Sequence, residues 1–238
     1  MEKICLIRQP AGLGDIIYCQ KIGYHYQKLG YKIIWPIIKV FSYLPNYIYD
    51  FEYPCEEDNF PYKEIYLNKE IKEIVQDQNF IFIPLHGHNL RDRSVMKSKY
   101  LLTNLDFHDW KDYITINRNI VKEVELFNLL NPNNEKYRLI NYNFGSPPYS
   151  LRMKKINFND TIKEIELKYI ENYSLFDWVT VIERAEEICM TDSAAALLVE
   201  LLRSNITKRL ICILRQPSTI DVKNMYTLNW KYIVGVRE

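Results

Sequence analysis

Two glycines and an aspartate follow the first apolar run of the chain. Gly12-Leu13-Gly14-Asp15 comes directly after residues 3–7 and precedes an amphipathic stretch. Glycines let the backbone pass close to a ligand, and a helix that begins here offers unpaired N–H groups and a partial positive charge. Asp15 could act there as a general base, or it could only complement the dipole of its own helix. The third glycine of a dinucleotide fingerprint would fall at Ile17, so this loop does not predict NAD binding.

A second candidate turn is Thr191-Asp192-Ser193, between an apolar run and an alanine-rich stretch. Small residues at 194–196 would let the helix start approach a ligand. Its free N–H groups and the Ser193 hydroxyl could then hold a diphosphate. A phosphate beside the Asp192 carboxylate would be repelled. We therefore expect Asp192 to be the N-cap or a partner for sugar hydroxyls.

A third candidate turn is Asn143-Phe144-Gly145-Ser146, which also follows an apolar run. Arg152, Lys154 and Lys155 come shortly after it. A glycine turn with nearby cations suits a charged leaving group such as a nucleotide diphosphate. The alternative is that these cations are solvated surface side chains.

Two histidines, His86 and His88, stand at the end of an apolar run and are followed by Arg91 and Arg93. This spacing could ligate a metal, but no cysteine or carboxylate is placed to complete a zinc site. A contact to an acceptor substrate or a structural role is the better interpretation. The chain also has no Asp-x-Asp pair for a divalent ion, no G-x-S-x-G elbow and no phosphate-binding P-loop. We therefore expect no metal and no cofactor, and neither a serine hydrolase nor a P-loop NTPase.

The elements around these turns alternate between strands and helices. The first 35 residues contain two apolar runs and, between them, apolar positions at helical spacing that end at Gly30, a typical C-cap residue. This pattern predicts strand, helix, strand. Further strands are predicted at 64–67 and 80–85, and apolar residues at 120, 124, 127 and 130 predict another helix.

The second half repeats this order. Strands are predicted at 138–144, near 162–169, at 187–191 and at 209–214, with helices after the capping box at Ser174 and in the stretch 194–202. Asn131-Pro132-Asn133-Asn134 breaks the helix before it, so we expect domains at 1–133 and 134–238. Successive strand–helix–strand units predict an α/β fold, with two Rossmann-like domains whose parallel sheets face each other.

Composition limits the classes of partner. Of 238 residues, 47% are hydrophobic and the net charge is +1, so the chain should fold and nucleic acid is not expected as a partner. No apolar run approaches the ~18 residues of a membrane span. Five cysteines form no C-x-x-C pair and four lie in apolar segments, which predicts free buried thiols in a reducing compartment. Together these features predict a soluble cytoplasmic protein.

The motifs in this order resemble the GT-B glycosyltransferases of the ADP-heptose:lipopolysaccharide heptosyltransferase family, glycosyltransferase family 9. The resemblance rests on Gly12-Leu13-Gly14-Asp15-Ile16, Phe144-Gly145-Ser146, Ile182-Glu183-Arg184-Ala185 and Met190-Thr191-Asp192-Ser193. It implies two Rossmann-like domains with parallel sheets facing a central cleft. It also implies a nucleotide-diphosphate sugar donor on the C-terminal domain, a glycan or glycolipid acceptor on the N-terminal domain, and no catalytic metal.

The resemblance also assigns roles to single residues. Asp15 matches the family's base, which takes a proton from the acceptor hydroxyl during inverting displacement at the anomeric carbon. Gly145 and Ser146 match the family's turn near the donor phosphates, and Asp192 with Ser193 matches its donor-binding turn. The neighbouring candidates add Arg152, Lys154 and Ala194 to the donor side and Gly12, Gly14, His86, His88 and Arg91 to the acceptor side.

Two departures from the family keep other functions open. Members usually carry glycine after the Asp-Ser pair and a histidine shortly beyond, whereas Ala194, Ala195, Ala196 and Leu197 follow here, and the chain is shorter than typical members. The alternatives are a binding module for a glycan or a protein that has lost catalysis, or a related sugar-nucleotide epimerase. Heavy use of Tyr, Asn, Lys and Ile indicates an AT-rich genome, and with the short length it suggests a viral source.

Overall fold

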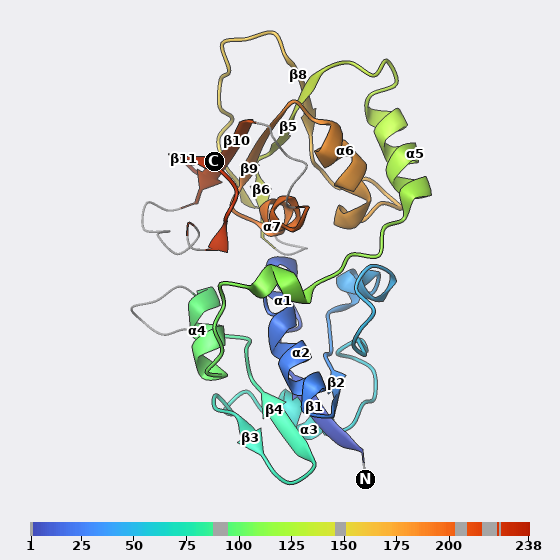
Figure 1. Ribbon diagram of the computed structural model, residues 1–238, viewed down its shortest axis with the longest axis vertical. Coiled ribbons are helices and arrows are strands. Elements are labelled where there is room, and N and C mark those ends of the chain that lie inside the picture. The colour runs from blue at the N-terminus through green and yellow to red at the C-terminus, as the bar shows by residue number, and fades with distance from the viewer. Residues whose placement is uncertain (1, 88–94, 146–150, 203–208, 216–222, 224) are drawn as a thin grey trace. The chain divides into compact units, whose positions relative to one another are not determined.

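The computed structural model describes residues 2–87, 95–145, 151–202, 209–215, 223 and 225–238 (Figure 1). The chain divides into two compact units, Met1–Asn117 and Arg118–Glu238. We call them unit 1 and unit 2.

Unit 1 contains a four-stranded sheet in the order β2-β1-β4-β3. β1 (Lys3–Ile7) pairs in parallel with β2 (Tyr31–Ile34) on one side and with β4 (Phe80–Ile83) on the other. β3 (Val75–Gln76) adds an antiparallel edge. The helices are α1 (Leu13–Tyr18), α2 (Gln20–Lys28), α3 (Lys63–Leu67) and α4 (Val95–Leu102), with 3-10 turns at Lys39–Phe41, Leu44–Asn46 and Trp110–Tyr113.

The opening strand–helix–strand unit is confirmed, including its C-cap. Gly30 follows α2 with a φ of 85°, and its N–H donates to Gln27 O over 2.9 Å. This is the left-handed conformation that glycine adopts without steric cost. The predicted single helix is interrupted at Cys19, so α1 and α2 are separate helices.

The strand predicted at 64–67 is wrong, because this segment is helix α3. Tyr66 N donates to Tyr62 O over 3.1 Å, and the Tyr66 ring is buried in an apolar cluster with Phe60 and Phe80. The Arg8 guanidinium donates to the carbonyls of Tyr66 and Asn68 at the end of the helix. These tertiary contacts override a four-residue pattern that is too short to distinguish strand from helix.

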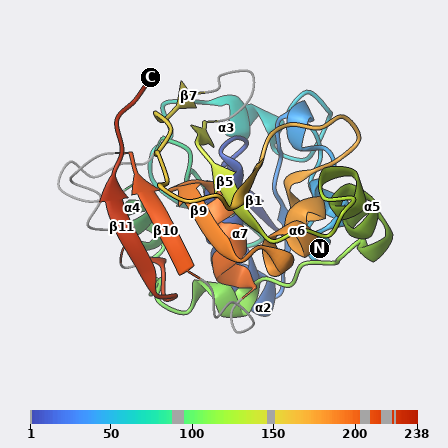
Figure 2. The same cartoon turned by 90° about the horizontal axis from the view of Figure 1, so that it is seen from above.

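Unit 2 contains a five-stranded, wholly parallel sheet in the order β11-β10-β9-β5-β8. Figure 2 shows β11, β10, β9 and β5 side by side in that order. The strands are β5 (Tyr137–Asn141), β8 (Lys163–Glu166), β9 (Glu187–Thr191), β10 (Arg209–Leu214) and β11 (Trp230–Val234), with a small antiparallel pair of β6 (Asn143–Phe144) and β7 (Leu151–Arg152). The helices are α5 (Ile120–Leu130), α6 (Val179–Arg184) and α7 (Ala194–Leu201), with a 3-10 turn at Leu175–Trp178. The predicted capping box at Ser174 and Asp177 is present in this turn.

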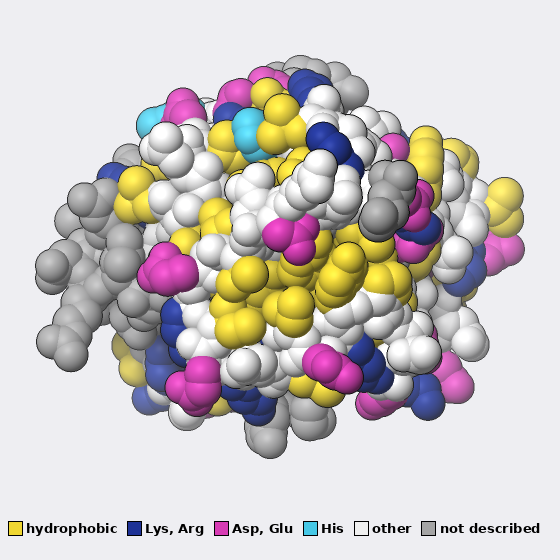
Figure 3. Space-filling view, turned by 90° about the horizontal axis from the view of Figure 1, so that it is seen from below, with side chains coloured by type: hydrophobic (Ala, Val, Ile, Leu, Met, Phe, Trp, Pro, Cys, Tyr) yellow, Lys and Arg dark blue, Asp and Glu magenta, His cyan; other side chains and the backbone are white. Residues whose placement is uncertain are grey.

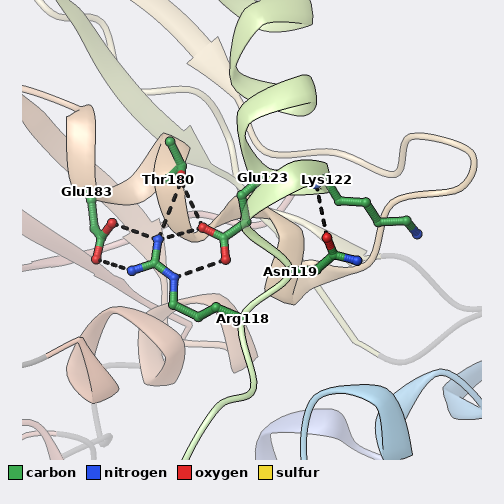
Figure 4. Close-up of polar contacts among 6 residues, drawn as sticks. All are labelled: Arg118, Asn119, Lys122, Glu123, Thr180 and Glu183. Carbon is green, nitrogen blue, oxygen red and sulfur yellow. Dashed lines mark hydrogen bonds and ion pairs between the residues drawn. The ribbon is translucent and has the colours of Figure 1, made fainter.

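The units divide before α5, whereas the sequence places the division after it, at residue 133. Packing explains the difference, since α5 lies against α6 and against the turn Leu175–Trp178. Figure 4 shows the polar contacts that anchor its start. The Arg118 guanidinium donates to the buried Glu123 carboxylate at 2.6 and 3.0 Å and to Glu183 at 2.9 Å. Thr180 Oγ1 donates to Glu123 Oε2 over 2.8 Å.

The α/β class and the parallel sheets are therefore confirmed, and a central cleft between the domains stays a prediction. The described helices include none that is both long enough and apolar enough to cross a bilayer.

All five cysteines are free thiols, and Cys5, Cys19, Cys189 and Cys212 are buried as expected. Large apolar side chains that are exposed in unit 1 include Tyr62, Leu67 and Val75. Figure 3 shows an apolar area bordered by acidic and basic side chains on the face viewed from below.

Candidate functional site

The glycine loop of unit 1 has a backbone geometry at its first position that favours glycine. Gly12 is the N-cap residue of α1 and has a φ of 79°, in the left-handed region. A Cβ atom at this position would collide with the Asp15 carboxylate. Gly14 and Asp15 lie in the first turn of α1, directly beyond the carboxyl end of β1. The backbone of Gly12 therefore packs against the acid that the sequence singles out.

Asp15 forms an ion pair with a lysine that the sequence motifs do not include. Lys99 Nζ, on α4, contacts Asp15 Oδ1 and lies 2.6 Å from Gln9 Oε1. The Lys99 side chain is only 2% exposed, whereas that of Asp15 is 29% exposed. The ammonium group is thus buried and the carboxylate that it contacts remains accessible to solvent.

His86 lies beyond the carboxyl end of β4, the neighbour of β1. Its backbone N–H donates to Arg8 O over 2.7 Å, which ties the two strand ends together. Burial lowers the pKa of His86, the nearby Lys99 ammonium lowers it further, and Asp15 opposes the shift. We therefore expect a neutral imidazole near the acid at neutral pH. The candidate acceptor residues His88 and Arg91 lie outside the described residues.

Unit 2 places Asp192 at the carboxyl end of β9, with one carboxylate oxygen paired and the other not. Asp192 Oδ1 accepts hydrogen bonds from Arg215 Nε at 2.7 Å and from Arg215 N at 3.3 Å. Oδ2 is buried and has no hydrogen-bond partner among the residues that the structure describes. The side chain is 1% exposed, and burial raises its pKa while Arg215 opposes the shift. A buried carboxylate oxygen without a partner carries a desolvation cost that a ligand hydroxyl would relieve.

Ser193, and not Asp192, occupies the N-cap position of α7. Within the described chain no side-chain hydrogen bond caps this helix. Ser193 Oγ instead accepts from Asn141 Nδ2 over 3.2 Å, at the end of the adjacent strand β5. Ala194 opens the helix, followed by the buried Ala195 and Ala196, so the first helical N–H groups carry only small side chains. This end of α7 can bind an anion.

The third predicted turn is less open to a ligand. Gly145 has a φ of 101° at the end of β6, and Ser146 lies outside the described residues. Arg152 Nη1 lies 2.6 Å from Glu166 Oε1 and 3.2 Å from Asn143 Oδ1, and the hydrogen bond with Glu166 is the main cause of its raised pKa. Lys154 is exposed. The Arg152 charge is already paired, whereas the Lys154 side chain can reach solvent.

Three residues of these sites, Gln9, Lys99 and Arg215, are not predicted from the sequence. Arg215 directly follows the predicted strand 209–214, so the rule that ligands bind beyond strand ends could have identified it. Lys99 lies 84 residues from Asp15 and carries no motif. Among the described residues, no three His, Cys, Asp or Glu side chains form a group that could hold a metal ion.

No protein-family model matches the sequence, and no curated protein is significantly similar to it. The chain is similar to the crystal structure of the glycosyl transferase family 9 from Veillonella parvula DSM 2008. The match covers 98% of this chain and 88% of that one, with a TM-score of 0.56 and 10% sequence identity. The chain therefore has the fold of that glycosyl transferase, and the resemblance inferred from the motifs is confirmed at the level of fold.

Proposed function

We propose that this chain is a glycosyltransferase of the GT-B type. It moves a sugar from a nucleotide-diphosphate sugar to a hydroxyl acceptor, without a metal ion or cofactor and with inversion at the anomeric carbon. The observation that carries the proposal is the fold match over 98% of the chain to a family 9 glycosyl transferase. Asp15 in unit 1 and Asp192 in unit 2 support it, because both lie beyond the carboxyl ends of parallel strands, where open α/β sheets bind ligands.

In the proposed reaction Asp15 is the base. The acceptor oxygen attacks the anomeric carbon as its proton passes to the Asp15 carboxylate, and the bond between that carbon and the diphosphate breaks. The electron pair leaves with the nucleoside diphosphate. Solvent access to the Asp15 side chain, held in place by Lys99, is the property that this role requires. In this proposal the neutral His86 contacts the acceptor.

The donor occupies the end of α7 in this proposal. The first N–H groups of α7, together with Ser193 Oγ and the Arg215 guanidinium, stabilise the negative charge of the departing diphosphate. The Asp192 Oδ2 atom accepts a hydrogen bond from a hydroxyl of the sugar or ribose. A hydroxyl ligand accounts for a buried oxygen that no described group satisfies.

The experiment compares the wild-type protein with Asp15→Asn. UDP-glucose, GDP-mannose and ADP-glucose are supplied with EDTA and with an alkyl glycoside as acceptor, and release of nucleoside diphosphate is followed. We expect turnover of at least one donor without added metal, and a loss of about 10²–10⁴-fold in kcat for Asp15→Asn. Stabilisation of the protein by the nucleoside diphosphate, measured as a shift in Tm, should be retained.

Asp109→Asn is the matched control, because Asp109 also pairs with a lysine of unit 1. It should leave kcat within about 2-fold, because the proposed reaction gives Asp109 no role. A protein that turns over no donor and is not stabilised by a nucleoside diphosphate would instead favour the binding module for a glycan or a protein. Conversion of a nucleotide-sugar without an acceptor would identify the epimerase.

A further inference from the structure

We infer that Lys99 is a positioning residue for Asp15, a role that rests on the proposed function. The ammonium group of Lys99 bridges Asp15 Oδ1 and Gln9 Oε1, two groups on opposite sides of the glycine loop. Through this bridge, α4 holds the orientation of the carboxylate that receives the proton.

The bridge belongs to a chain of hydrogen bonds that begins in the sheet. Trp35 Nε1, just beyond β2, donates to Gln9 O over 3.0 Å. The Gln9 side-chain amide donates in turn to Ala11 O, which turns its Oε1 toward Lys99. Gln9 is 2% exposed and Trp35 is fully buried, so both are fixed by packing. Lys99 is therefore hydrogen-bonded to a Gln9 side chain that contacts beyond the ends of β1 and β2 hold in place.

The Asp15 carboxylate lies between the Lys99 ammonium group and the side of Gly12 that lacks a Cβ. Lys99 contacts Oδ1, and Oδ2 lies so close to the Gly12 backbone that a Cβ there would collide with it. Rotation of the carboxylate would break the contact with Lys99, and the absence of a Cβ at residue 12 leaves room for Oδ2 in the observed orientation. A reacting group held in one orientation lowers the barrier because the alignment is made before the substrate arrives.

Stability alone is a poor explanation for this lysine. Replacing a buried ion pair with apolar residues of similar volume is often neutral or stabilising, because both charges lose their hydration. Lys99 is the more buried partner, at 2% exposure, and its carboxylate partner is the accessible one. The ion pair thus fixes a group at the surface of the site, which is what a positioning role requires.

The test is Lys99→Met, which keeps the length of the side chain and removes the ammonium group. Lys21→Met is the matched control, because Lys21 is also a buried lysine of unit 1 whose ammonium group contacts an aspartate, Asp109. With the donor that the wild-type protein turns over best, we expect Lys99→Met to lower kcat by about 10–100-fold with KM changed less than about 2-fold, the scale of a misplaced catalytic group. Lys21→Met should leave kcat and KM within about 2-fold of wild type.

A second variant, Lys99→Gln, distinguishes a loss of catalysis from a loss of folding. Lys99→Gln keeps a donor toward Gln9 but lacks the charge, and it should show the same fall in kcat while the melting transition stays cooperative. Wild-type kcat in a folded Lys99→Met or Lys99→Gln would overturn the role of Lys99. A wild-type protein that turns over no nucleotide-sugar would overturn the proposed function instead. Thermal melts of Asp15→Asn, Lys99→Met and the double variant then test the pair itself, and additive shifts in Tm would contradict the coupling.

Discussion

The Asp192 carboxylate links the stability of unit 2 to pH. Burial raises its pKa above the ordinary value of about 4. For an acid with a raised folded-state pKa, the stabilising contribution is complete below the unfolded pKa and is lost as the pH rises through the folded pKa. At neutral pH the protein therefore carries the desolvation cost of an ionised, half-paired carboxylate.

Asp192→Asn should remove this cost and weaken ligand binding together. We expect the variant to be more stable than wild type by about 1 kcal/mol at pH 8, with the advantage shrinking toward pH 4, and to lose most of the Tm shift caused by a nucleoside diphosphate. Thermal melts of both proteins from pH 4 to pH 8 measure the difference.

Asp160→Asn provides a control of opposite sign. The hydrogen bond from Arg138 lowers the pKa of Asp160, so its contribution is present above the unfolded pKa and is lost as the pH falls through the folded pKa. Asp160→Asn should therefore be less stable than wild type at neutral pH, and this difference in stability should shrink as the pH falls. If the difference in stability between Asp192→Asn and wild type does not vary with pH, the raised pKa of Asp192 in the folded protein is contradicted.

A comparison of Gly12 and Gly30 distinguishes the cost of a positive φ from the cost of a collision between an added Cβ and a neighbouring side chain. Both have a positive φ, but only at Gly12 would a Cβ meet another group, the Asp15 carboxylate. We expect Gly30→Ala to cost about 1 kcal/mol, from φ alone, and Gly12→Ala to cost about 2 kcal/mol or more. Urea unfolding measures both free energies. Equal costs, or wild-type turnover in Gly12→Ala, would mean that the carboxylate does not lie against Gly12 as described.

Single residues at strand ends were predictable from the sequence, and their partners were not. Asp15 in unit 1 and Asp192 in unit 2 each lie beyond the carboxyl end of a parallel strand, where ligands bind in open α/β sheets. Lys99 contacts Asp15 from a helix far along the chain, so no local spacing indicates it. Local spacing also gives no indication of the partners of Glu200, a buried acid in α7 that accepts hydrogen bonds from Thr227, Leu228 and Trp230.

At the scale of elements, length decides what the sequence can predict. The eleven-residue helix Ile120–Leu130 is predicted because its apolar positions repeat over three turns. The six-residue strand Arg209–Leu214 is predicted because five consecutive apolar residues indicate a buried strand. The segment 64–67 is too short for either period to be distinctive, and tertiary contacts made it helical. The two-residue strand Val75–Gln76 is exposed and carries no pattern of its own.

The start of α5 is the element most dependent on one side chain. Arg118→Met would leave the fully buried Glu123 carboxylate with Thr180 as its remaining partner shown in Figure 4. We expect unit 2 to lose about 2–3 kcal/mol, near the lower end for a broken buried pair because Arg118 is itself partly exposed. Urea unfolding followed by circular dichroism measures the loss.

Lys163→Met is the control for Arg118→Met, since Lys163 pairs with Glu135 at 2.6 Å between two partly exposed side chains. It should cost less than about 1 kcal/mol. Equal losses in the two variants would show that burial of Glu123 does not govern the anchor.

At the scale of the whole molecule, the alternation of strands and helices predicts two α/β units. It does not predict the order of the strands within each sheet. Strand β5 lies between β8 and β9 because the chain returns from the edge strand to the centre of the sheet. Local periodicity records which segments are strands but not which segments pair. The boundary at Asn117 was missed for a related reason, since Pro132 marks the end of a helix whose packing already belongs to unit 2.

The distribution of the cysteines allows the opening of each unit to be followed separately. Cys5 and Cys19 are buried in unit 1, Cys189 and Cys212 are buried in unit 2, and Cys55 is partly exposed. Burial raises the pKa of Cys19 and Cys189 to about 12, so these thiols stay protonated and unreactive while the fold is closed. Alkylation kinetics read out by peptide mass would then report two local unfolding rates from one unmodified sample, without an engineered probe.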